Sequence, residues 1–382
     1  MKTLYLHIGT PKTASTAIQD FCWENQQVLN SKGYYYPDME LRFPEIRYVR
    51  NAHFLIGQNQ IPKSDRDFEK ERETVDKCFA KLYASFQKYD NIILTDESMW
   101  HYGFGYEGMG WDRIKKELEK GIFSLKVIVY LRRQDDFIFS WWNQMVKEGF
   151  HRSSVITWET MAKKRPVVKL DYYKMLDRIA AFAGKENITV RLFDRKKFVG
   201  QTIQADFLDA IGLTLSEEYQ MPEDFSNTSL TKNYIEIKRI LNELPGLDKK
   251  SNAWFRKHAT DCSLDSGNDK KYHIFSKDEM EAFLAEYEEG NRKIAQEYLG
   301  SDTLFDNTYR AEGKWSPDNP YMWEDTVKFF GSIMNQLIAE TEALKHETAI
   351  STRQLNALKR LLRHPLDTVG RKLKNKLSNP PQ

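Results

Sequence analysis

Short apolar runs recur along the first half of the chain, each too brief for a helix and each bounded by turn residues. Runs of this kind predict buried β-strands. The run at 125–131 is rich in β-branched residues and stops at two arginines, which makes it the clearest of the set. The expected strands are residues 4–8, 33–37, 91–95, 125–131 and 188–193.

Helical patterns fill the gaps between these runs. Strands that alternate with helices predict an α/β fold, with a central parallel sheet flanked by helices. Ligands of such sheets bind beyond the carboxyl ends of the strands, so the loops after Ile8, Thr95 and Leu131 are expected to open onto one site. The expected helices are residues 17–29, 68–89, 135–148, 172–182 and 203–211.

The second half of the chain has a different pattern. After Gly212 the strand signals fade, and amphipathic helical patterns take over at 231–244, 277–298 and 321–344. We therefore expect an added C-terminal helical subdomain. The expected parts are a core at 1–215 that includes a loop-rich insertion at 38–65, a helical continuation at 216–345 and a tail at 346–382.

The tail is expected to be basic, amphipathic and partly disordered. Residues 345–382 hold nine Lys and Arg against two acids, with apolar residues at helical spacing around 355–362. The last residues are Asn-Pro-Pro-Gln, a poor sequence for ordered structure. Such a segment is either a solvated helix end or a peripheral contact with an anionic membrane surface.

Composition excludes some classes of function. The formal net charge is +2 over 382 residues, which gives no basis for nucleic-acid binding. Cys22, Cys78 and Cys262 are far apart and odd in number, which is typical of a reducing compartment and argues against structural zinc. The first strand starts almost at Met1, and no run is long enough to span a bilayer. We expect a cytoplasmic protein.

The stretch from Gly9 to Thr16 joins the first expected strand to the first expected helix. Such a junction aims unpaired backbone N–H groups and the positive end of a helix dipole at one point, which favours an anion. Lys12 adds a mobile positive charge, and Thr13, Ser15 and Thr16 add hydroxyl donors. We expect phosphate or sulfate binding. The common nucleotide-binding loop does not fit, because Lys12 has no second glycine before it.

The stretch resembles the 5′-phosphosulfate loop of the sulfotransferase family, whose pattern is Gly-x-Pro-Lys-Thr-Gly-Ser/Thr-Thr. Ala14 replaces the usual second glycine. A second stretch resembles the family's 3′-phosphate site, Leu-Arg-x-Pro-x-Asp-Arg-x-x-Ser, with Gln134 in place of proline and Phe137 in place of a common arginine. The matching residues are Gly9, Pro11, Lys12, Thr13, Ser15 and Thr16 in the first stretch, and Leu131, Arg132, Asp136 and Ser140 in the second.

Looser resemblance extends to about residue 244. Residues 191–198 and 206–213 look like the family's late strand and helix, and Asn227-Thr-Ser-Leu is similar to a segment of bacterial members. Secretory members usually carry an N-terminal membrane anchor, which we do not expect here. The chain therefore resembles a bacterial glycan-type member with the P-loop-like sulfotransferase fold.

The resemblance implies a donor, a reaction and residue roles. The donor would be 3′-phosphoadenosine 5′-phosphosulfate, with no metal, and a sulfuryl group would pass to a hydroxyl of a glycan or glycolipid through a loose, in-line transition state. Lys12 would stabilise the leaving phosphate oxygen. The 3′-phosphate would contact Arg132 and Ser140, and the 5′-phosphate would lie in the loop of Gly9, Pro11, Lys12, Thr13, Ala14, Ser15 and Thr16.

The acceptor also needs a base. Glu97 follows a strand at the correct edge, where many family members place an acid or a histidine, and we rank it ahead of His53 and His101. Aromatic residues near both loops favour a carbohydrate acceptor, although most of them are expected in the core. They are Trp100, Tyr102, Phe104, Tyr106, Trp111, Trp141 and Trp142.

Other interpretations stay open at this point. Arg132 could simply pair with Asp135 or Asp136 at the sheet edge. A divergent P-loop kinase or nucleotide hydrolase would need a magnesium-binding acid after an apolar strand, a role open to Asp96. A non-catalytic nucleotide- or glycan-binding protein would keep the anion loop without the chemistry.

Overall fold

The computed structural model describes residues 2–44, 46–58, 61–149, 152–165, 169–222, 229–267 and 269–363. Its main sheet has five parallel strands in the order β2-β3-β1-β4-β5. The central strand is β1, in which Leu6 lies opposite Leu94 of β3 and Val127 of β4. The predicted parallel α/β sheet is thus confirmed. The strands are β1 Thr3–His7, β2 Tyr34–Tyr35, β3 Asn91–Thr95, β4 Ser124–Leu131 and β5 Ile188–Leu192.

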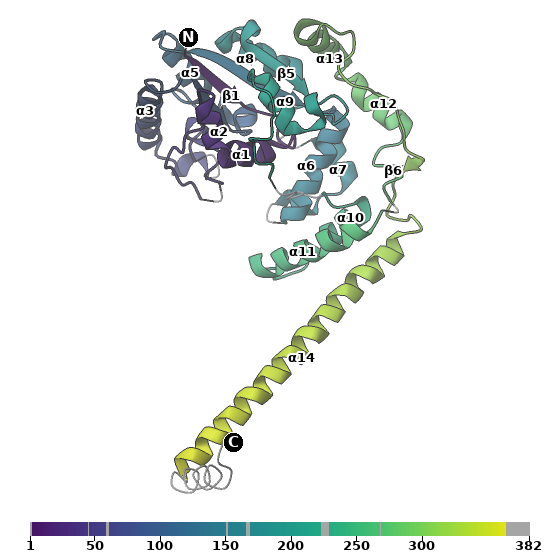
Figure 1. Cartoon of the computed structure of the whole chain (residues 1–382). Coiled ribbons are helices and arrows are strands. Elements are labelled where there is room, and N and C mark those ends of the chain that lie inside the picture. Colours follow the sequence, from purple (N-terminus) through teal and green to yellow (C-terminus); the bar gives the residue numbers. More distant parts are fainter. Residues whose placement is uncertain are drawn as a thin grey trace.

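Helices cover both faces of this sheet (Figure 1). Successive strand residues point to opposite faces, so Val127 and Val129 pack in one core while Ile128 and Tyr130 pack in another. The first core lies under α3 Phe68–Ser85, α5 Gly110–Leu118 and α8 Tyr172–Ala183. The second lies under α1 Ser15–Glu24, α2 Gln26–Ser31 and α9 Ile203–Ala210.

The first predicted helix is broken in two at Asn25. Its side-chain amide donates to the carbonyls of Phe21, 2.9 Å away, and Gln220, 2.8 Å away, while its oxygen accepts from the Gln220 N–H at 2.7 Å. A buried asparagine that bonds backbone in this way competes with the helix ladder. The pattern at 17–29 therefore predicted helical structure but not the break at Asn25.

The insertion at 38–65 has little regular structure in its described part. It contains two short 3₁₀ turns, His53–Leu55 and Lys63–Asp65. Asn51 ties it to the sheet, because its side-chain oxygen accepts from the Thr95 N–H at 2.8 Å and its amide donates to the Ile93 carbonyl at 3.0 Å. The insertion is thereby held at the carboxyl end of β3. A short helix, α4 Met99–Tyr102, follows β3.

The C-terminal helices build a separate core around α6 Gln134–Glu148. Phe137 and Trp142 of α6 pack there with Tyr234, Phe283 and Phe329. The predicted helical C-terminal part is thus present; its exact division from the core, at 215 and 345, stays a prediction. The further elements are α7 Trp158–Lys164, α10 Lys232–Leu241, α11 Lys249–Asp265, α12 Lys277–Ala285, α13 Glu288–Ile294 and a two-stranded pair, β6 Tyr272–His273 and β7 Gly313–Lys314.

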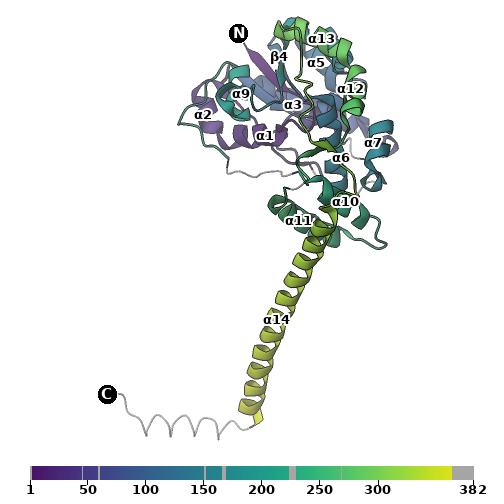
Figure 2. The same cartoon turned by 90° about the vertical axis from the view of Figure 1, so that its right-hand side faces the viewer.

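The last helix, α14, spans Met322–Arg363, runs through residue 345 without a break and projects from the body as a long rod (Figures 1 and 2). The tail expected at 346–382 is therefore helical up to residue 363, and residues 364–382 lie outside the described part. Among the described helices, none combines the length and the apolar character needed to cross a bilayer.

Candidate active site

The loop after β1 is held against β4 by two threonines. Thr10 donates to the Tyr130 carbonyl through both its N–H, at 3.1 Å, and its Oγ1, at 3.0 Å. Thr13 Oγ1 donates to the Thr10 carbonyl at 2.6 Å. The hydroxyls of Thr10 and Thr13 therefore fix the conformation of the anion loop predicted from the sequence. Thr13 is buried and stabilises this loop from within.

Three residues of this loop have left-handed backbone conformations, with φ of 39° at Gly9, 69° at Lys12 and 59° at Ala14. Ala14 is the N-cap of α1 and offers no side-chain cap to the helix. The first N–H groups of α1 are therefore left for another acceptor. Ser15 Oγ is buried and has no partner in the described part of the chain. A Cβ on Gly9 would stand 2.8 Å from that oxygen, so glycine keeps the cradle open.

Ala14 is strained in this position, because a left-handed conformation brings Cβ close to the following carbonyl oxygen. We expect Ala14→Gly to raise the free energy of unfolding by about 0.5–1 kcal/mol, measured by urea denaturation. Ala17→Gly, in the first turn of α1, is the matched control and is expected to lower it by about 0.5–1 kcal/mol. Destabilisation by Ala14→Gly would contradict the strained loop.

Lys12 reaches from the loop to α6, where its Nζ donates to Gln144 Oε1 at 3.0 Å. Burial lowers the pKa of Lys12 to about 8, and the neighbouring charges of Arg132 and Lys147 act in the same direction. A lysine with such a pKa keeps its charge at neutral pH but needs an anion to compensate it. The side chain of Lys12 thus lies between its own loop and α6, in positively charged surroundings.

Arg132 follows β4 and donates through Nη1 to the Lys12 carbonyl at 3.2 Å. Its neighbour Arg133 takes the nearby carboxylate instead, with Nε 2.7 Å from Asp135 Oδ1 and Nη2 2.8 Å from Asp135 Oδ2. In the described residues, no carboxylate forms an ion pair with Arg132. Burial lowers the pKa of Arg132, yet an arginine stays charged. An unpaired, enclosed guanidinium therefore lies next to the anion loop, and the ion-pair interpretation applies to Arg133.

Ser140 is buried on α6, one turn before Gln144. Residues four apart share one face of a helix, so Ser140 lies on the face that meets Lys12. The structure thus brings both predicted phosphate stretches, the loop and the pair of Arg132 and Ser140, to one edge of the sheet.

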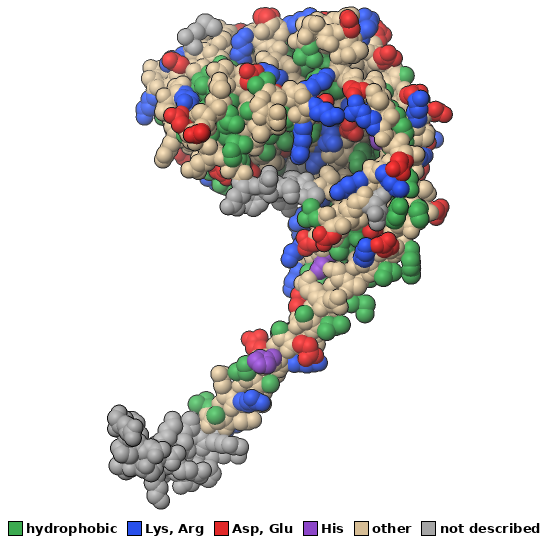
Figure 3. Space-filling view, turned by 45° about the vertical axis from the view of Figure 1, so that its right-hand side comes forward, with side chains coloured by type: hydrophobic (Ala, Val, Ile, Leu, Met, Phe, Trp, Pro, Cys, Tyr) green, Lys and Arg blue, Asp and Glu red, His purple; other side chains and the backbone are tan. Residues whose placement is uncertain are grey.

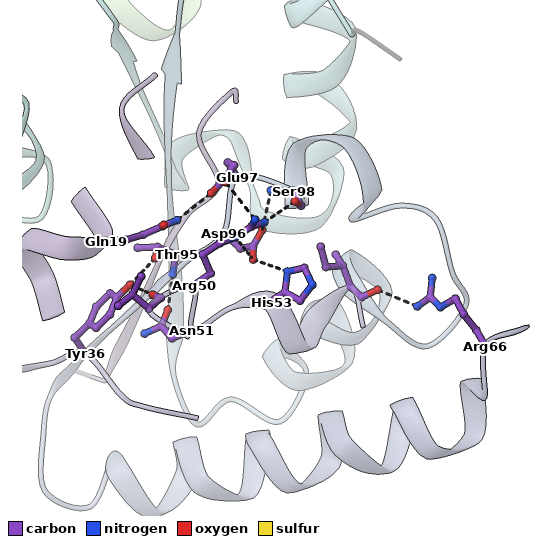
Figure 4. A network of polar contacts seen from close by, with 12 residues as sticks. Gln19, Tyr36, Arg50, Asn51, His53, Arg66, Thr95, Asp96, Glu97 and Ser98 are labelled. Carbon is purple, nitrogen blue, oxygen red and sulfur yellow. Dashed lines mark hydrogen bonds and ion pairs between the residues drawn. The ribbon is translucent and has the colours of Figure 1, made fainter. Parts of the chain in front are cut away.

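A buried polar network fills the adjacent end of β3 (Figure 4). Asp96 receives Arg50 Nη2 at 2.6 Å and Nε at 3.2 Å, the Ser98 N–H at 2.7 Å, and faces His53 Nδ1 at 2.9 Å. Burial alone would raise the pKa of Asp96, but Arg50 and His53 outweigh it and hold the pKa far below its usual range. Asp96 is therefore a charged anchor that fixes the insertion to the sheet.

The three candidate bases differ in their surroundings. Glu97 keeps 21% of its side chain exposed, accepts from Gln19 Nε2 at 2.9 Å and lies 3.4 Å from Arg50 Nη1. The side chain of His53 is 2% exposed, and its Nδ1 contacts Asp96 Oδ2. Burial lowers the pKa of His101 to about 4, and neither ring nitrogen has a partner among the described residues. Of the three, only Glu97 is both partly exposed and close enough to Lys12 for its negative charge to raise the pKa of that lysine.

Sequence reasoning missed Gln19, Arg50 and Gln144 as site residues. Gln144 follows Ser140 by one helical turn, so the shared face of α6 was the signal available for it. Arg50 gave no such signal, because its partner Asp96 lies 46 residues away in the sequence. Of the similar segment at 227–230, residues 227 and 228 lie outside the described part of the chain.

Comparisons with known proteins give limited similarity. No family profile matches the chain. A protein of Archaeoglobus fulgidus named only as uncharacterized is 30% identical over 182 residues, which is 47% of each chain, so the match spans about half the length of this relative. A crystal structure titled as a sulfotransferase from Alicyclobacillus acidocaldarius is 13% identical, with a TM-score of 0.37 over 63% of this chain and 94% of that one.

Proposed function

We propose that this protein is a sulfotransferase that moves a sulfuryl group from 3′-phosphoadenosine 5′-phosphosulfate to a hydroxyl of a glycan or glycolipid. The observation that carries the proposal is the 3.2 Å contact between Arg132 Nη1 and the Lys12 carbonyl. It joins two stretches that each resemble a phosphate site of one nucleotide. An anion loop alone would fit many phosphate ligands, whereas a second cationic site beside it fits a ligand with two separate phosphates.

The residues present fit such a donor. The uncapped first turn of α1 and the partnerless Ser15 Oγ are donors that need an acceptor. Arg132 offers a planar charged fork without a carboxylate partner in the described structure. The loop would hold the 5′-phosphate, and Arg132 with Ser140 the 3′-phosphate. The donor supplies an activated sulfuryl group when bound.

The chain's own residues would then act by position and charge. Lys12 stabilises negative charge on the leaving phosphate oxygen, which grows as the bond to sulfur breaks. Gln144 orients Lys12 through the 3.0 Å contact of its Oε1 with Nζ. Glu97 takes the proton from the acceptor hydroxyl, and Arg50 and Gln19 hold its carboxylate in place.

The acceptor class rests on side chains around these loops. Trp100, Trp111 and Trp142 are buried and serve the core. The aromatic residues that stay partly exposed, and so can stack on a sugar ring, are Tyr102, Phe104, Tyr106 and Trp141. A lipid-linked acceptor would suit the basic stretch from Lys345 onward, which favours an anionic membrane surface.

Asp96 is poorly suited to the magnesium role that the kinase interpretation gives it. Asp96, the acid after β3 that this interpretation requires, is already occupied by Arg50, His53 and the Ser98 N–H. A carboxylate neutralised by an arginine in this way is poorly placed to bind a cation. We therefore favour sulfuryl transfer.

Arg132→Ala is expected to weaken binding of adenosine 3′,5′-bisphosphate by about 1.5–3 kcal/mol, the scale of hydrogen bonds to a charged group. Titration calorimetry measures this directly. Arg133→Ala is the matched control, since Arg133 bonds Asp135 and the Asp306 carbonyl, and it is expected to leave the affinity within about 0.5 kcal/mol. Equal affinity of wild type and Arg132→Ala would make Arg132 a structural residue.

Transfer itself is tested with donor labelled in its sulfate group. Wild-type protein is expected to move label to an oligosaccharide or glycolipid acceptor from a mixed panel, and the Lys12→Ala, Glu97→Ala variant is expected not to. If wild type binds the bisphosphate but consumes no labelled donor with any acceptor, the chain is a binding protein and the proposed activity is wrong.

A further inference from the structure

The distal part of α14 has no support from the rest of the described chain. Only its first turns pack on the body, where Phe329 and Ile333 are buried and Asp325 accepts from Asn233 Nδ2 at 2.8 Å. From Leu337 to residue 359 every side chain is exposed. A helix gains little stability in water without an apolar face to bury. This segment therefore needs a partner.

Exposed apolar residues follow a regular order along this helix. Positions at alternating steps of four and three residues, the spacing of a coiled-coil seam, hold eight of them, and the other three seam positions are threonine or serine. The exposed Ile338 and Ile350 lie off this spacing. Trp323 is 76% exposed, Met334 61% and Leu344 62%, and Figure 3 shows hydrophobic side chains recurring down the projecting helix. The seam positions are Trp323, Val327, Phe330, Met334, Leu337, Thr341, Leu344, Thr348, Ser351, Leu355 and Leu358.

This seam is separate from the face that packs on the body. The seam residues Val327, Phe330 and Met334 stay exposed beside the buried Phe329 and Ile333. The two threonines of the seam are also compatible with burial, because Thr341 Oγ1 donates to the Leu337 carbonyl at 2.7 Å and Thr348 Oγ1 to the Leu344 carbonyl at 2.8 Å. Their hydroxyls are satisfied within the helix, so only their methyl groups need to meet a partner.

Charges beside the seam specify a partner and an orientation. In heptad terms position a holds Val327, Met334, Thr341, Thr348 and Leu355, and position d holds Trp323, Phe330, Leu337, Leu344, Ser351 and Leu358. Position g is then occupied by Glu340, Glu347 and Gln354, and position e by Lys345, Thr352 and Lys359. In a parallel pair each g residue faces the e residue five positions later on the partner. Glu340 would face Lys345, whereas antiparallel helices would put Glu against Glu.

We infer that α14 forms a parallel, two-stranded coiled coil with α14 of a second copy of this chain. Three of the five a positions are β-branched and three of the six d positions are leucine, and β-branched residues at a with leucine at d favour two strands. In the single chain Lys345 pairs with Glu342 at 2.8 Å, with both side chains about two thirds exposed, so Lys345 exchanges a weak intrahelical pair for one across the seam. The dimer carries two bodies at one end of the coil.

Light scattering of the full chain at micromolar concentration tests the assembly. Wild type is expected at twice the 45.0 kDa of one chain. The Leu344→Glu, Leu355→Glu variant is expected at one chain mass, because both side chains are exposed in the single chain and its fold does not need them. Ile350→Glu, which changes an equally apolar side chain away from the seam, is expected to stay dimeric. A monomeric wild type, or a dimer that survives the double substitution, overturns the inference.

Orientation is tested by oxidative cross-linking in the background of the three native cysteines, of which Cys22 and Cys78 are buried. Leu358→Cys is expected to give a disulfide-linked dimer, since parallel strands bring position 358 of both copies together. Ile350→Cys is expected to stay uncrosslinked.

Sedimentation with phosphatidylglycerol vesicles tests whether the seam binds a membrane instead of a second chain. A monomer that binds vesicles through Leu344 and Leu355 would assign the seam to a membrane and contradict the dimer.

Discussion

Glu97→Gln is expected to lower kcat by about 10²–10⁴-fold, the range typical of removing a general base. The amide keeps the shape of the carboxylate and still accepts from Gln19, whose Nε2 lies 2.9 Å from Glu97 Oε2, so the local structure is preserved. The substitution removes the ability to take the acceptor proton and also the negative charge that pairs with Arg50, whose Nη1 lies 3.4 Å from the carboxylate. Steady-state transfer of labelled sulfate measures the change, and calorimetry with adenosine 3′,5′-bisphosphate is expected to show unchanged donor-site affinity.

His101→Gln is the control for this prediction. Both ring nitrogens of His101 are buried, and burial lowers the pKa of the imidazole to about 4. His101 is therefore a weak, enclosed base, and its loss is expected to change kcat by less than about tenfold. If His101→Gln abolishes turnover while Glu97→Gln does not, the base is His101 and the role given to Glu97 is wrong.

Lys12→Ala is expected to lower kcat by about 10²–10³-fold, as for loss of one donor aimed at charge that develops in a transition state. A pH profile adds a second readout. The charged form of Lys12 is the active one, and burial lowers its pKa to about 8, so kcat/KM is expected to fall about tenfold per pH unit above that value. Lys12→Arg keeps the charge at high pH and is expected to remove this decline. A decline that persists in Lys12→Arg would assign the titration to another group.

Much of the fold, and the position of the two stretches that resemble phosphate sites, could be predicted because their signals are local. The apolar runs that became β1, β3 and β4 are contiguous, and the loops that follow them must open at one edge once the strands are parallel. Lys12 and Arg132 are therefore expected at one edge of the sheet, where Arg132 Nη1 contacts the Lys12 carbonyl. The left-handed conformation of Ala14 explains why glycine is usual at that position.

The rest depended on contacts between distant segments. Gln144 meets Lys12 only because α6 crosses the loop, and Arg50 meets Asp96 only because the insertion folds back on β3. Helix α14 shows the same limit. Apolar spacing around residue 355 was visible in the sequence, but a residue that faces the core and one that faces a second chain look alike there. Exposure in the folded chain separates Phe329 from Phe330.

The central claim is that one nucleotide with two separate phosphates spans the loop at Lys12 and the guanidinium of Arg132. Titration calorimetry of the wild-type chain with adenosine 3′,5′-bisphosphate, and in parallel with ATP and magnesium, tests it most directly. We predict saturable binding of the bisphosphate and none of ATP with magnesium at the same concentrations. Tight binding of ATP with magnesium and no heat from the bisphosphate would contradict the proposed donor site.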